Sequence, residues 1–387
     1  MADNKDKKLL NVPHLRFPEF SGEWECSTIG REFELYSGNT PSRLDKEQFN
    51  GNVNWISSGE LKEHYIYDTK EKITEEAASC NNLRLLPIGT FVIAIYGLEA
   101  EGVRGTGSVI QKKSTISQAC MAFSSKGTIT NEFLYSWYKK HGNLIGLKYA
   151  QGTKQQNLSY DIISQFRISY PSITEQKKLE EFISLIDERI ATQNKIIEDL
   201  KLLKSAIAET VFNNMKGHLT TNLSTICNIV KGKQVNGEEL SEKGKYYVMN
   251  GGITPSGYYD QCNTPDNTIS ISEGGNSCGY VQYNKSSFWS GGHCYTLQDI
   301  TCGVDIQYLF HYLKRYESNI MNLRIGTGLP NIQKKDLENF RIALPPTNVQ
   351  KEISSCLTAI EDKIMVEVKW LDCAQKEKQH LLRQMFI

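Results

Sequence analysis

Residues 152–179 read GTKQQNLSYDIISQFRISYPSITEQKKL, and residues 326–353 read GTGLPNIQKKDLENFRIALPPTNVQKEI, so one stretch of sequence occurs twice. At a fixed offset of 174 residues the Gly-Thr pair, an Asn, the Phe-Arg-Ile run, a Pro and the Gln-Lys pair all recur. The match continues without a gap to Phe212 and Phe386. Because such self-similarity is typical of repeated structural units, the chain is predicted to contain the same architecture twice.

Each copy leads into a predicted long helix. Pro171 and Pro345 end an extended segment, after which Thr174 and Asn348 are suited to act as N-caps. Apolar residues then recur at steps of three and four, the spacing of a coiled-coil stripe, with Gln193 as an interruption. Leu203 and Val368 continue the spacing. The residues predicted to pack helix on helix are Leu179, Ile186, Ile190, Ile197, Leu200, Ile353, Leu357, Ile360, Ile364 and Leu371.

Helix length favours pairing of the two helices with each other. A helix of roughly 38 residues reaches about 57 Å, which exceeds the width of a small domain. Much of each stripe must therefore lie beyond its own domain, and packing the helices together buries both stripes. An antiparallel pair of helices would place the two domains at opposite ends, related by a pseudo-twofold axis. A symmetric dimer places its two DNA-binding domains in a similar way.

The remaining sequence fits two mixed domains. A chain of 387 residues suits two domains of common size. Residues 25–170 and 217–345 are rich in Gly, Asn, Ser, Thr and Tyr with short β-prone runs, which predicts α/β domains with many loops. The predicted class is α+β. Its parts are an N-terminal arm (1–24), a first domain (25–170), a spacer helix (171–216), a second domain (217–345) and a second spacer helix (346–387).

Composition indicates a globular protein of cytosolic type. Hydrophobic residues make up 39% and charged residues 23%. The longest apolar run, Phe91–Tyr96, is too short to cross a bilayer, and the ten cysteines, none in a Cys-x-x-Cys arrangement, are expected to be reduced. Lys+Arg and Asp+Glu are balanced at 44 each, but residues 102–160 contain a single acid, Glu132, among eight basic residues. That stretch is locally cationic, as is the stretch 306–335.

Motifs for chemistry on DNA are missing or incomplete. A base methyltransferase needs a Gly-rich cofactor turn and an Asn-Pro-Pro-aromatic loop, whereas 344–347 reads Leu-Pro-Pro-Thr. The nearest approach to a nucleotide-binding loop, 237–246, is two residues too long and ends in Tyr246. No catalytic residue is predicted.

Two groups of residues contain types that can bind metal ions. Asp45 with Glu60 and Lys62 could form the Mg²⁺ site of a nuclease, the alternative being solvated charges. A second group lacks the paired spacing of zinc ligands and is expected to consist of buried free thiols with a histidine. Its members are Cys262, Cys278, His293, Cys294 and Cys302. No metal site is predicted.

Amides, hydroxyls and cations gather in the loops of both domains, as sequence readout of DNA requires. Ordinary turn chemistry is the alternative for each loop. In the first domain the DNA-binding candidates are Asn39, Thr40, Ser42, Arg43, Arg104, Thr106, Lys112, Lys113, Thr153, Lys154, Gln155, Gln156 and Asn157. In the second they are Lys231, Lys233, Gln234, Asn250, Tyr258, Asn276, His293, Arg324, Thr327, Asn331 and Lys334.

The chain resembles the specificity subunits of type I restriction-modification systems over nearly its whole length. The resemblance rests on residues 326–332 (GTGLPNI), 340–346 (FRIALPP) and 350–353 (QKEI). The first copy departs from the pattern where Lys154-Gln155-Gln156 replaces Gly-Leu-Pro, which makes its loop contacts less secure. The early residues 12–20 (VPHLRFPEF) also fit, and this arm is expected to pack beside the C-terminal helix.

The resemblance implies a chain without catalysis of its own that binds double-stranded DNA. It implies assembly with two methyltransferase subunits that modify adenine and two motor-nuclease subunits that restrict DNA. It also implies that S-adenosylmethionine, ATP and Mg²⁺ belong to those partners. Two other hypotheses remain open at this point: an autonomous DNA nuclease or methyltransferase, and a coiled-coil scaffold for protein assembly.

Overall fold

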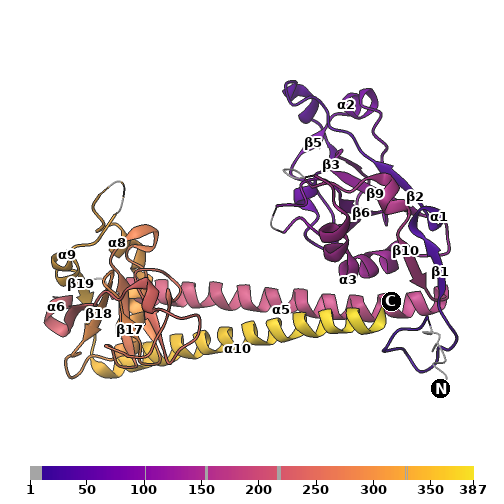
Figure 1. Ribbon diagram of the computed structural model, residues 1–387. Coiled ribbons are helices and arrows are strands. Elements are labelled where there is room, and N and C mark those ends of the chain that lie inside the picture. The colour runs from indigo at the N-terminus through magenta and orange to yellow at the C-terminus, as the bar shows by residue number, and fades with distance from the viewer. Residues whose placement is uncertain (1–10, 101, 153–155, 216–218, 327, 329) are drawn as a thin grey trace, which may run out of the picture. The chain divides into compact units, whose positions relative to one another are not determined.

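The computed structural model describes residues 11–100, 102–152, 156–215, 219–326, 328 and 330–387 (Figure 1). The chain divides into two compact units. Unit 1 contains Met1–Thr192 and Leu371–Ile387, and unit 2 contains Gln193–Trp370. Each unit therefore holds one domain together with segments of both long helices.

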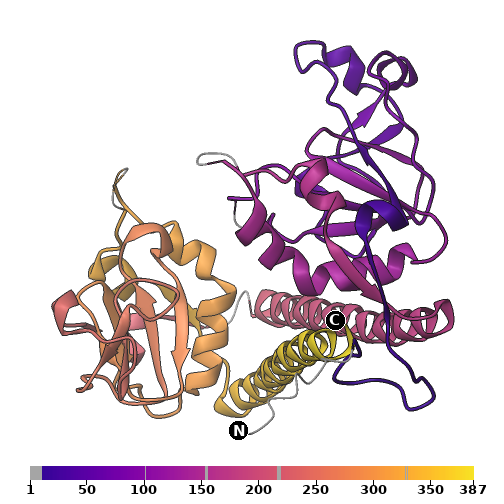
Figure 2. The same cartoon turned by 45° about the vertical axis from the view of Figure 1, so that its right-hand side comes forward.

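Domain 1 in unit 1 is built on a five-stranded sheet. The strand order is β2 (Phe33–Ser37), β9 (Cys120–Ser125), β6 (Phe91–Ala94), β7 (Gly107–Ile110) and β4 (Tyr65–Ile66). Its pairs are antiparallel except β4 with β7. Helix α3 (Asn131–Tyr149) packs against β6, β7 and β9 (Figure 2). Phe91, Phe123 and Phe133 are buried in the core between them.

A smaller sheet adjoins this core. Its order is β5 (Lys72–Ile73), β3 (Val53–Ile56) and β8 (Ser114–Ile116). The 3-10 helices η1 (Lys46–Phe49) and η2 (Ser58–Glu60) and helix α2 (Glu75–Cys80) surround it, and Trp55 is buried at its centre. A third pair, β1 (Glu25–Thr28) with β10 (Arg167–Tyr170), is flanked by α1 (Ile29–Glu32) and α4 (Tyr160–Ser164) and leads into the long helix.

Domain 2 in unit 2 repeats this topology. Its main sheet has the order β12 (Asn228–Lys231), β18 (Cys294–Gln298), β15 (Thr268–Ser272) and β16 (Val281–Asn284). The small sheet is β14 (Gly257–Tyr259), β13 (Tyr246–Met249) and β17 (Trp289–Ser290), and the leading pair is β11 (Thr220–Asn222) with β19 (Arg341–Ala343). The helical elements are α6 (Leu223–Ile226), η3 (Gly237–Glu239), η4 (Gly275–Ser277), α7 (Ile306–Arg315), α8 (Glu317–Met321) and α9 (Lys334–Glu338). Only a partner for β4 is lacking among the described strands, so the duplication extends through the whole domain fold.

The two long helices are α5 (Ile173–Asn214) and α10 (Thr347–Met385). The predicted N-caps Thr174 and Asn348 are wrong, because both residues lie inside the helices. The first turn forms earlier, with the Gln176 N–H donating to the Ser172 carbonyl at 2.9 Å and the Gln350 N–H to the Pro346 carbonyl at 3.1 Å.

The helices pair antiparallel through repeat counterparts. In unit 1, Lys378 of α10 bonds to Asp187 of α5. In unit 2, Lys204 of α5 forms an ion pair with Glu361 of α10 at 3.1 Å, which is the same pair with the helices exchanged. Gln193, buried in the stripe, donates to its own counterpart Glu367. The polar residue that interrupts the apolar pattern therefore has a hydrogen-bond partner in its own repeat counterpart.

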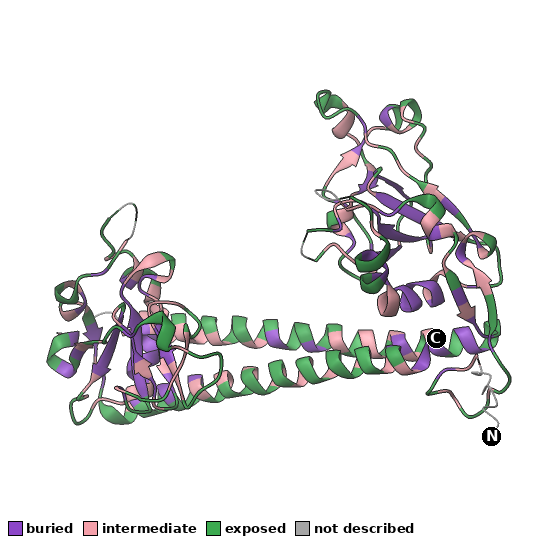
Figure 3. Ribbon diagram, in the orientation of Figure 1, coloured by how far each residue is buried: buried purple, intermediate pink, exposed green. Residues whose placement is uncertain are grey.

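The predicted packing residues are all at least partly covered (Figure 3). Leu179, Ile197, Ile353 and Leu357 are buried, while Ile186, Ile190, Leu200, Ile360, Ile364 and Leu371 are half-buried. Leu203 and Val368 do not belong to this stripe, since their exposed fractions are 49% and 44%. A straight helix drifts relative to a strict repeat, so residues with the right spacing can still turn outward.

The described part of the N-terminal arm packs on the helices of unit 1. The Leu15 N–H donates to the Gln384 carbonyl at 3.0 Å, Arg16 pairs with the buried Glu175 at 2.7 Å, and Phe17 packs edge-on against Phe182. The expected packing beside the C-terminal helix is confirmed. In the described residues, no helix has the length and apolar character needed to span a membrane.

Candidate nucleic-acid interface

One end of the domain 2 sheet collects polar side chains around a carboxylate. Strand β12 ends at Lys231, β15 ends just before Glu273, and β18 begins just after His293, so these residues meet because the strands are antiparallel. Glu273 is only 8% exposed and lies 2.6 Å from the Lys231 Nζ and 3.5 Å from the His293 Nδ1. It also accepts a hydrogen bond from the Tyr295 hydroxyl at 2.9 Å. Glu273 therefore organises this end of the sheet.

Further candidates surround the same carboxylate. The Asn250 Oδ1 accepts from the His293 N–H at 3.1 Å, and Trp289 donates to the Lys233 carbonyl at 2.7 Å. Asn331 pairs through its backbone with Ile325 and Gly274. Backbones approach so closely here that a Cβ on Gly232 would lie 2.2 Å from the Gly291 carbonyl oxygen, which only glycine allows. We call Lys231, Lys233, Gln234, Asn250, Glu273, His293 and Asn331 the second polar end.

The other domain 2 candidates are at its margin or elsewhere. Asn276 lies in η4, next to the second polar end. Arg324 lies near Cys278: burial raises the pKa of Cys278, and the positive charge of Arg324 reduces that rise. Lys334 begins α9 and lies 3.7 Å from Glu338. Tyr258 belongs to the small sheet, in register with Tyr247. Thr327 lies outside the described residues.

The equivalent end of the domain 1 sheet holds a second set. Arg104 donates to the Gln156 Oε1 at 2.9 Å, and the Gln156 N–H donates to Glu99 at 2.8 Å. Asn157 pairs with Gln151, and Thr106 closes a turn by donating to the Val103 carbonyl at 2.7 Å. We call Arg104, Thr106, Gln156 and Asn157 the first polar end. Thr153, Lys154 and Gln155 lie outside the described residues.

Other domain 1 candidates make contacts outside the set named the first polar end. Arg43 bonds to Glu71 at 2.9 Å and lies over the rings of Phe49 and Trp55, so it covers the small-sheet core and lowers the pKa of Glu71. Asn39 and Thr40 form a local turn after β2, in which the Thr40 N–H donates to the Asn39 Oδ1 at 2.8 Å. Ser42 is exposed in the same loop.

Lys112 and Lys113 are exposed and lie between β7 and β8, at the opposite end of β7 from Arg104. Lys112 faces Asp68 at 3.5 Å. The structure does not bring these two lysines to the first polar end.

Sequence reasoning missed Glu273 as an organising residue. The sequence feature that could have identified Glu273 is its position as a single acid in a loop of Gly, Asn and Ser directly after a β-prone run. The three groups that it binds come from strands and loops that are distant in sequence, so the signal did not reveal its partners.

Glu60 and Asp45, two residues of the possible nuclease site, have local structural roles. The Glu60 carboxylate accepts from the Ser57 N–H at 2.9 Å and from the Lys70 N–H at 2.7 Å, and Asp45 caps η1. Within the described ranges, no group of three or more His, Cys, Asp or Glu side chains is arranged to hold a metal ion. All ten cysteines are free, but Cys262 and Cys302 are exposed, so the expectation of burial is wrong for those two and holds for Cys278 and Cys294.

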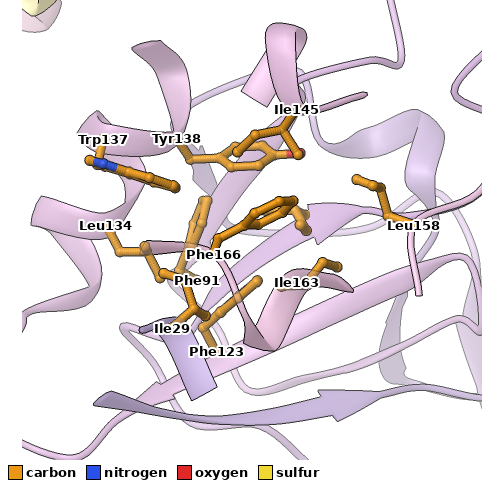
Figure 4. A pocket seen from close by; sticks show the side chains of 11 residues that line it. Ile29, Phe91, Phe123, Leu134, Trp137, Tyr138, Ile145, Leu158, Ile163 and Phe166 are labelled. Atoms are coloured by element: carbon orange, nitrogen blue, oxygen red, sulfur yellow. The ribbon is translucent and has the colours of Figure 1, made fainter. Parts of the chain in front are cut away.

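One enclosed space in the core of domain 1, formed by described residues, is too small for a small-molecule substrate. The space between α3, α4 and the sheet is lined by apolar and aromatic side chains such as Phe91, Phe123 and Trp137 (Figure 4). Its volume is about 10 Å³, hardly enough for one water molecule, and its walls expose no polar surface. Binding surfaces must therefore be sought outside the core.

Comparisons with known proteins place both halves in one family. The family model described as "Type I restriction modification DNA specificity domain" matches residues 21–202 and 216–369. The type I restriction enzyme MjaIX specificity subunit of Methanocaldococcus jannaschii is 23% identical, over 93% of this chain and 92% of that protein. The EcoR124I/EcoR124II specificity subunit of Escherichia coli is 28% identical, over 51% of this chain and 48% of that protein.

Solved structures share the fold. The type I restriction-modification S subunit from M. genitalium has a TM-score of 0.68 at 19% identity, with 97% of this chain and 99% of that chain covered. A chain from a study of complex assembly and conformational transition of the type I R-M system has a TM-score of 0.57 at 15% identity, with 94% and 97% covered. With both halves matched, the chain belongs to the type I restriction-modification DNA specificity family, and its role is that of the DNA-recognition specificity subunit.

Proposed function

We propose that the chain reads one interrupted duplex DNA target, one half-target with each domain, and directs adenine methylation and restriction by partner subunits. The observation that carries this proposal is the duplicated polar sheet end. Both domains carry amide and cationic side chains at the same end of the same sheet, yet the side chains themselves differ. Two equivalent surfaces with different chemistry suit two different half-targets.

The partners proposed are two methyltransferase subunits and two motor-nuclease subunits. A chain that repeats its whole architecture offers each docking surface twice, which supports an even number of each partner. We also propose that S-adenosylmethionine, ATP and Mg²⁺ are bound by those partners. In this arrangement the chain contributes binding and orientation rather than a catalytic group.

Methylome sequencing tests the proposal. Cells that express this chain with its cognate methyltransferase should show adenine methylation at one motif with two defined parts and a fixed gap. Absence of any such motif would contradict the proposal. Cleavage or methylation of DNA by the purified chain alone would favour an autonomous enzyme, and failure to bind any duplex even within the methyltransferase complex would favour a protein-assembly scaffold.

The paired helices should set the gap between the half-targets. Ala191 and Met365 are repeat counterparts next to Gln193 and Glu367, so matched insertions there keep the helices in register. A heptad added after each would lengthen the spacer by about 10 Å, which corresponds to roughly three base pairs of duplex. The methylated gap should grow accordingly, whereas an insertion in α5 alone should abolish methylation. An unchanged gap in the matched variant would show that the paired helices do not set the gap.

A further inference from the structure

Each domain carries a groove at the same place in its fold. In domain 1 a groove of about 530 Å³ lies between the C-terminal half of α3, the end of α4 and the start of β10, with Trp137, His141, Phe166 and Arg167 among its walls. In domain 2 a groove of about 510 Å³ lies between α7, α8, the end of α9 and the start of β19, with Tyr312, Tyr316, Phe340 and Arg341 among its walls. Neither groove belongs to the polar ends described above.

The two grooves are built from repeat counterparts. Phe166-Arg167 and Phe340-Arg341 are identical and follow an amide residue, Gln165 or Asn339, in each copy. Both arginines reach the neighbouring strand at the same position. Arg167 contacts the Cys26 Sγ at 3.5 Å, and the Arg341 Nε donates to the Thr220 Oγ1 at 3.1 Å. Trp137 and Tyr312 both supply an aromatic ring seven residues after the N-cap of their helix.

Internal packing explains only part of why the Phe-Arg-Ile sequence is identical in the two copies. Ile168 and Ile342, next in each sequence, are fully buried, and the two phenylalanines are half-buried in their cores. Arg167 and Arg341 are exposed, and within the described part of the chain no carboxylate forms an ion pair with either. A guanidinium beside aromatic rings is the usual partner of a carboxylate at a protein interface.

The features that the grooves share favour a protein segment over DNA. The first groove has one additional cation, Lys148, which corresponds to Leu323 in the second groove, and the second groove contains the acid Asp336. His141 of the first groove corresponds to Tyr316, and burial lowers the pKa of His141, so it adds no positive charge near neutral pH. A surface for phosphates would need the positive charges in both copies. What remains common is an aromatic wall and a single arginine, which suits an apolar side chain next to a carboxylate.

We propose that the two grooves bind the same apolar and acidic segment of the two methyltransferase subunits, one subunit to each groove. The inference rests on the proposed function, because that function supplies two copies of one partner. The carboxylate of the segment pairs with Arg167 or Arg341, and its apolar side chain lies against Trp137 and Phe166, or against Tyr312 and Phe340. Two identical subunits require the same surface twice, and the chain provides it.

Charge reversal tests the inference. The variants are R167E, R341E and the double variant, each co-purified with the methyltransferase and weighed by native mass spectrometry. The unaltered chain should carry two methyltransferase subunits, each single variant one, and the double variant none, with at least a tenfold loss of affinity per groove. R167K and R341K, which keep the charge, should recover part of the binding. K46E and K243E reverse exposed lysines outside the grooves and should leave two subunits bound.

The outcomes separate this inference from the proposed function. If the double variant still binds two subunits with unchanged affinity, the grooves are not the docking site although the function stands. If the unaltered chain binds no methyltransferase, the proposed function itself fails. If the double variant keeps two subunits but loses duplex binding, the grooves contact DNA and the inference is overturned. Circular dichroism on each variant separates unfolding from lost docking.

Discussion

The junction of domain 1 with α5 and the junction of domain 2 with α10 share one set of hydrogen bonds. In the first, the buried Gln176 side chain donates to the carbonyls of Pro171 and Thr128, both at 2.9 Å, and accepts from the Thr130 N–H at 2.9 Å. Thr130 is the N-cap of α3, so one amide joins the start of the long helix to the start of the domain helix.

The second junction repeats this arrangement. Gln350 donates to the carbonyls of Pro345 at 2.8 Å and Gly303 at 3.3 Å, and it accepts at 2.9 Å from the N–H of Asp305, the N-cap of α7. Both glutamines are almost fully buried. An amide can satisfy a donor and two acceptors at once without a charge, which explains why the same residue serves in both copies.

The charges beside the two junctions differ. In unit 1, His64 lies between the rings of Tyr65 and Tyr135, with the Glu132 carboxylate at 2.8 Å and the Asp187 carboxylate at 3.4 Å. Burial alone would lower the pKa of His64, but its contacts with Asp187 and Glu132 outweigh burial and raise it. Lys139 and Lys378 belong to the same cluster, and burial with the charge of Lys378 lowers the pKa of Lys139 to about 8.

In unit 2 a different histidine, on α7, makes a neutral link to the long helix. His311 bonds to the Thr358 hydroxyl of α10 at 2.9 Å, and burial together with the charge of Lys204 lowers its pKa to about 4. The hydrogen bonds that begin the helices and the lysine–carboxylate pair between the helices therefore recur in both repeats, whereas the surroundings of the two histidines differ. The two junctions should therefore respond alike to loss of packing and oppositely to pH.

The largest effect should come from the last aromatic residue of each repeat. Phe212 is buried against Tyr308 and Tyr312 in unit 2, and Phe386 is buried against Phe133 in unit 1. Phe212→Ala and Phe386→Ala should each cost about 3–5 kcal/mol, in the unit where the ring lies. Amide hydrogen exchange in each unit measures this. Leu202→Ala, at a residue 68% exposed, is the control and should change little. If either variant lowered the stability of both units equally, the assignment of each ring to one unit would be contradicted.

The junction glutamines should give the next largest effect. Gln176→Leu and Gln350→Leu each leave buried backbone groups without partners, at a cost of roughly 2–4 kcal/mol. Hydrogen exchange at the first turn of α5 or α10 should rise by similar amounts in the two variants. The exposed Gln379→Leu serves as the control on α10. If only one junction weakens, the two sets of hydrogen bonds are not equivalent.

The two histidines should give opposite pH profiles. The stabilising contribution of His64, whose pKa is raised, is fully present below the unfolded value of about 6.5 and is lost as pH rises through its folded pKa. His311 prefers the neutral form, so its contribution is present above about 6.5 and is lost as pH falls toward a folded pKa of about 4. Hydrogen exchange in each unit between pH 5 and 8 should show these trends. His64→Gln and His311→Gln should each flatten the profile of one unit only, and parallel profiles in the unaltered chain would contradict the assignment.

The smallest effect should appear at the DNA surface. Lys334→Ala removes one exposed cation of domain 2 and should weaken duplex binding with a salt slope shallower by about 1. Binding titrations at several salt concentrations measure the slope. Lys46→Ala, which removes an exposed cation of η1 outside both polar ends, should leave it unchanged. An unaltered slope for Lys334→Ala would remove that residue from the interface.

The sequence predicted the long helices and the mixture of strands and loops in the domains. It predicted few of the side-chain contacts in the candidate nucleic-acid interface. It paired Gln176 with Gln350 without a role, because a role needs the carbonyls of Thr128 and Gly303, which come from elsewhere in the chain. It predicted a DNA contact for Arg43, but it did not reveal that the Arg43 guanidinium has Glu71, Phe49 and Trp55 as neighbours in the folded chain. Exposure and partners of a loop residue depend on neighbours that no local pattern encodes.

By itself the sequence determined the duplication, the two long helices and the stripe that joins them, because an offset of 174 residues and a step of three or four are properties of the linear chain. Only the tertiary structure decided which polar groups meet. Lys231 and Glu273 are 42 residues apart, and Arg104 and Gln156 are 52 apart, yet each pair is in contact. In domain 2 the antiparallel strands bring Lys231 and Glu273 together at their ends, and in each domain the packing of helices against the start of β10 or β19 forms a groove.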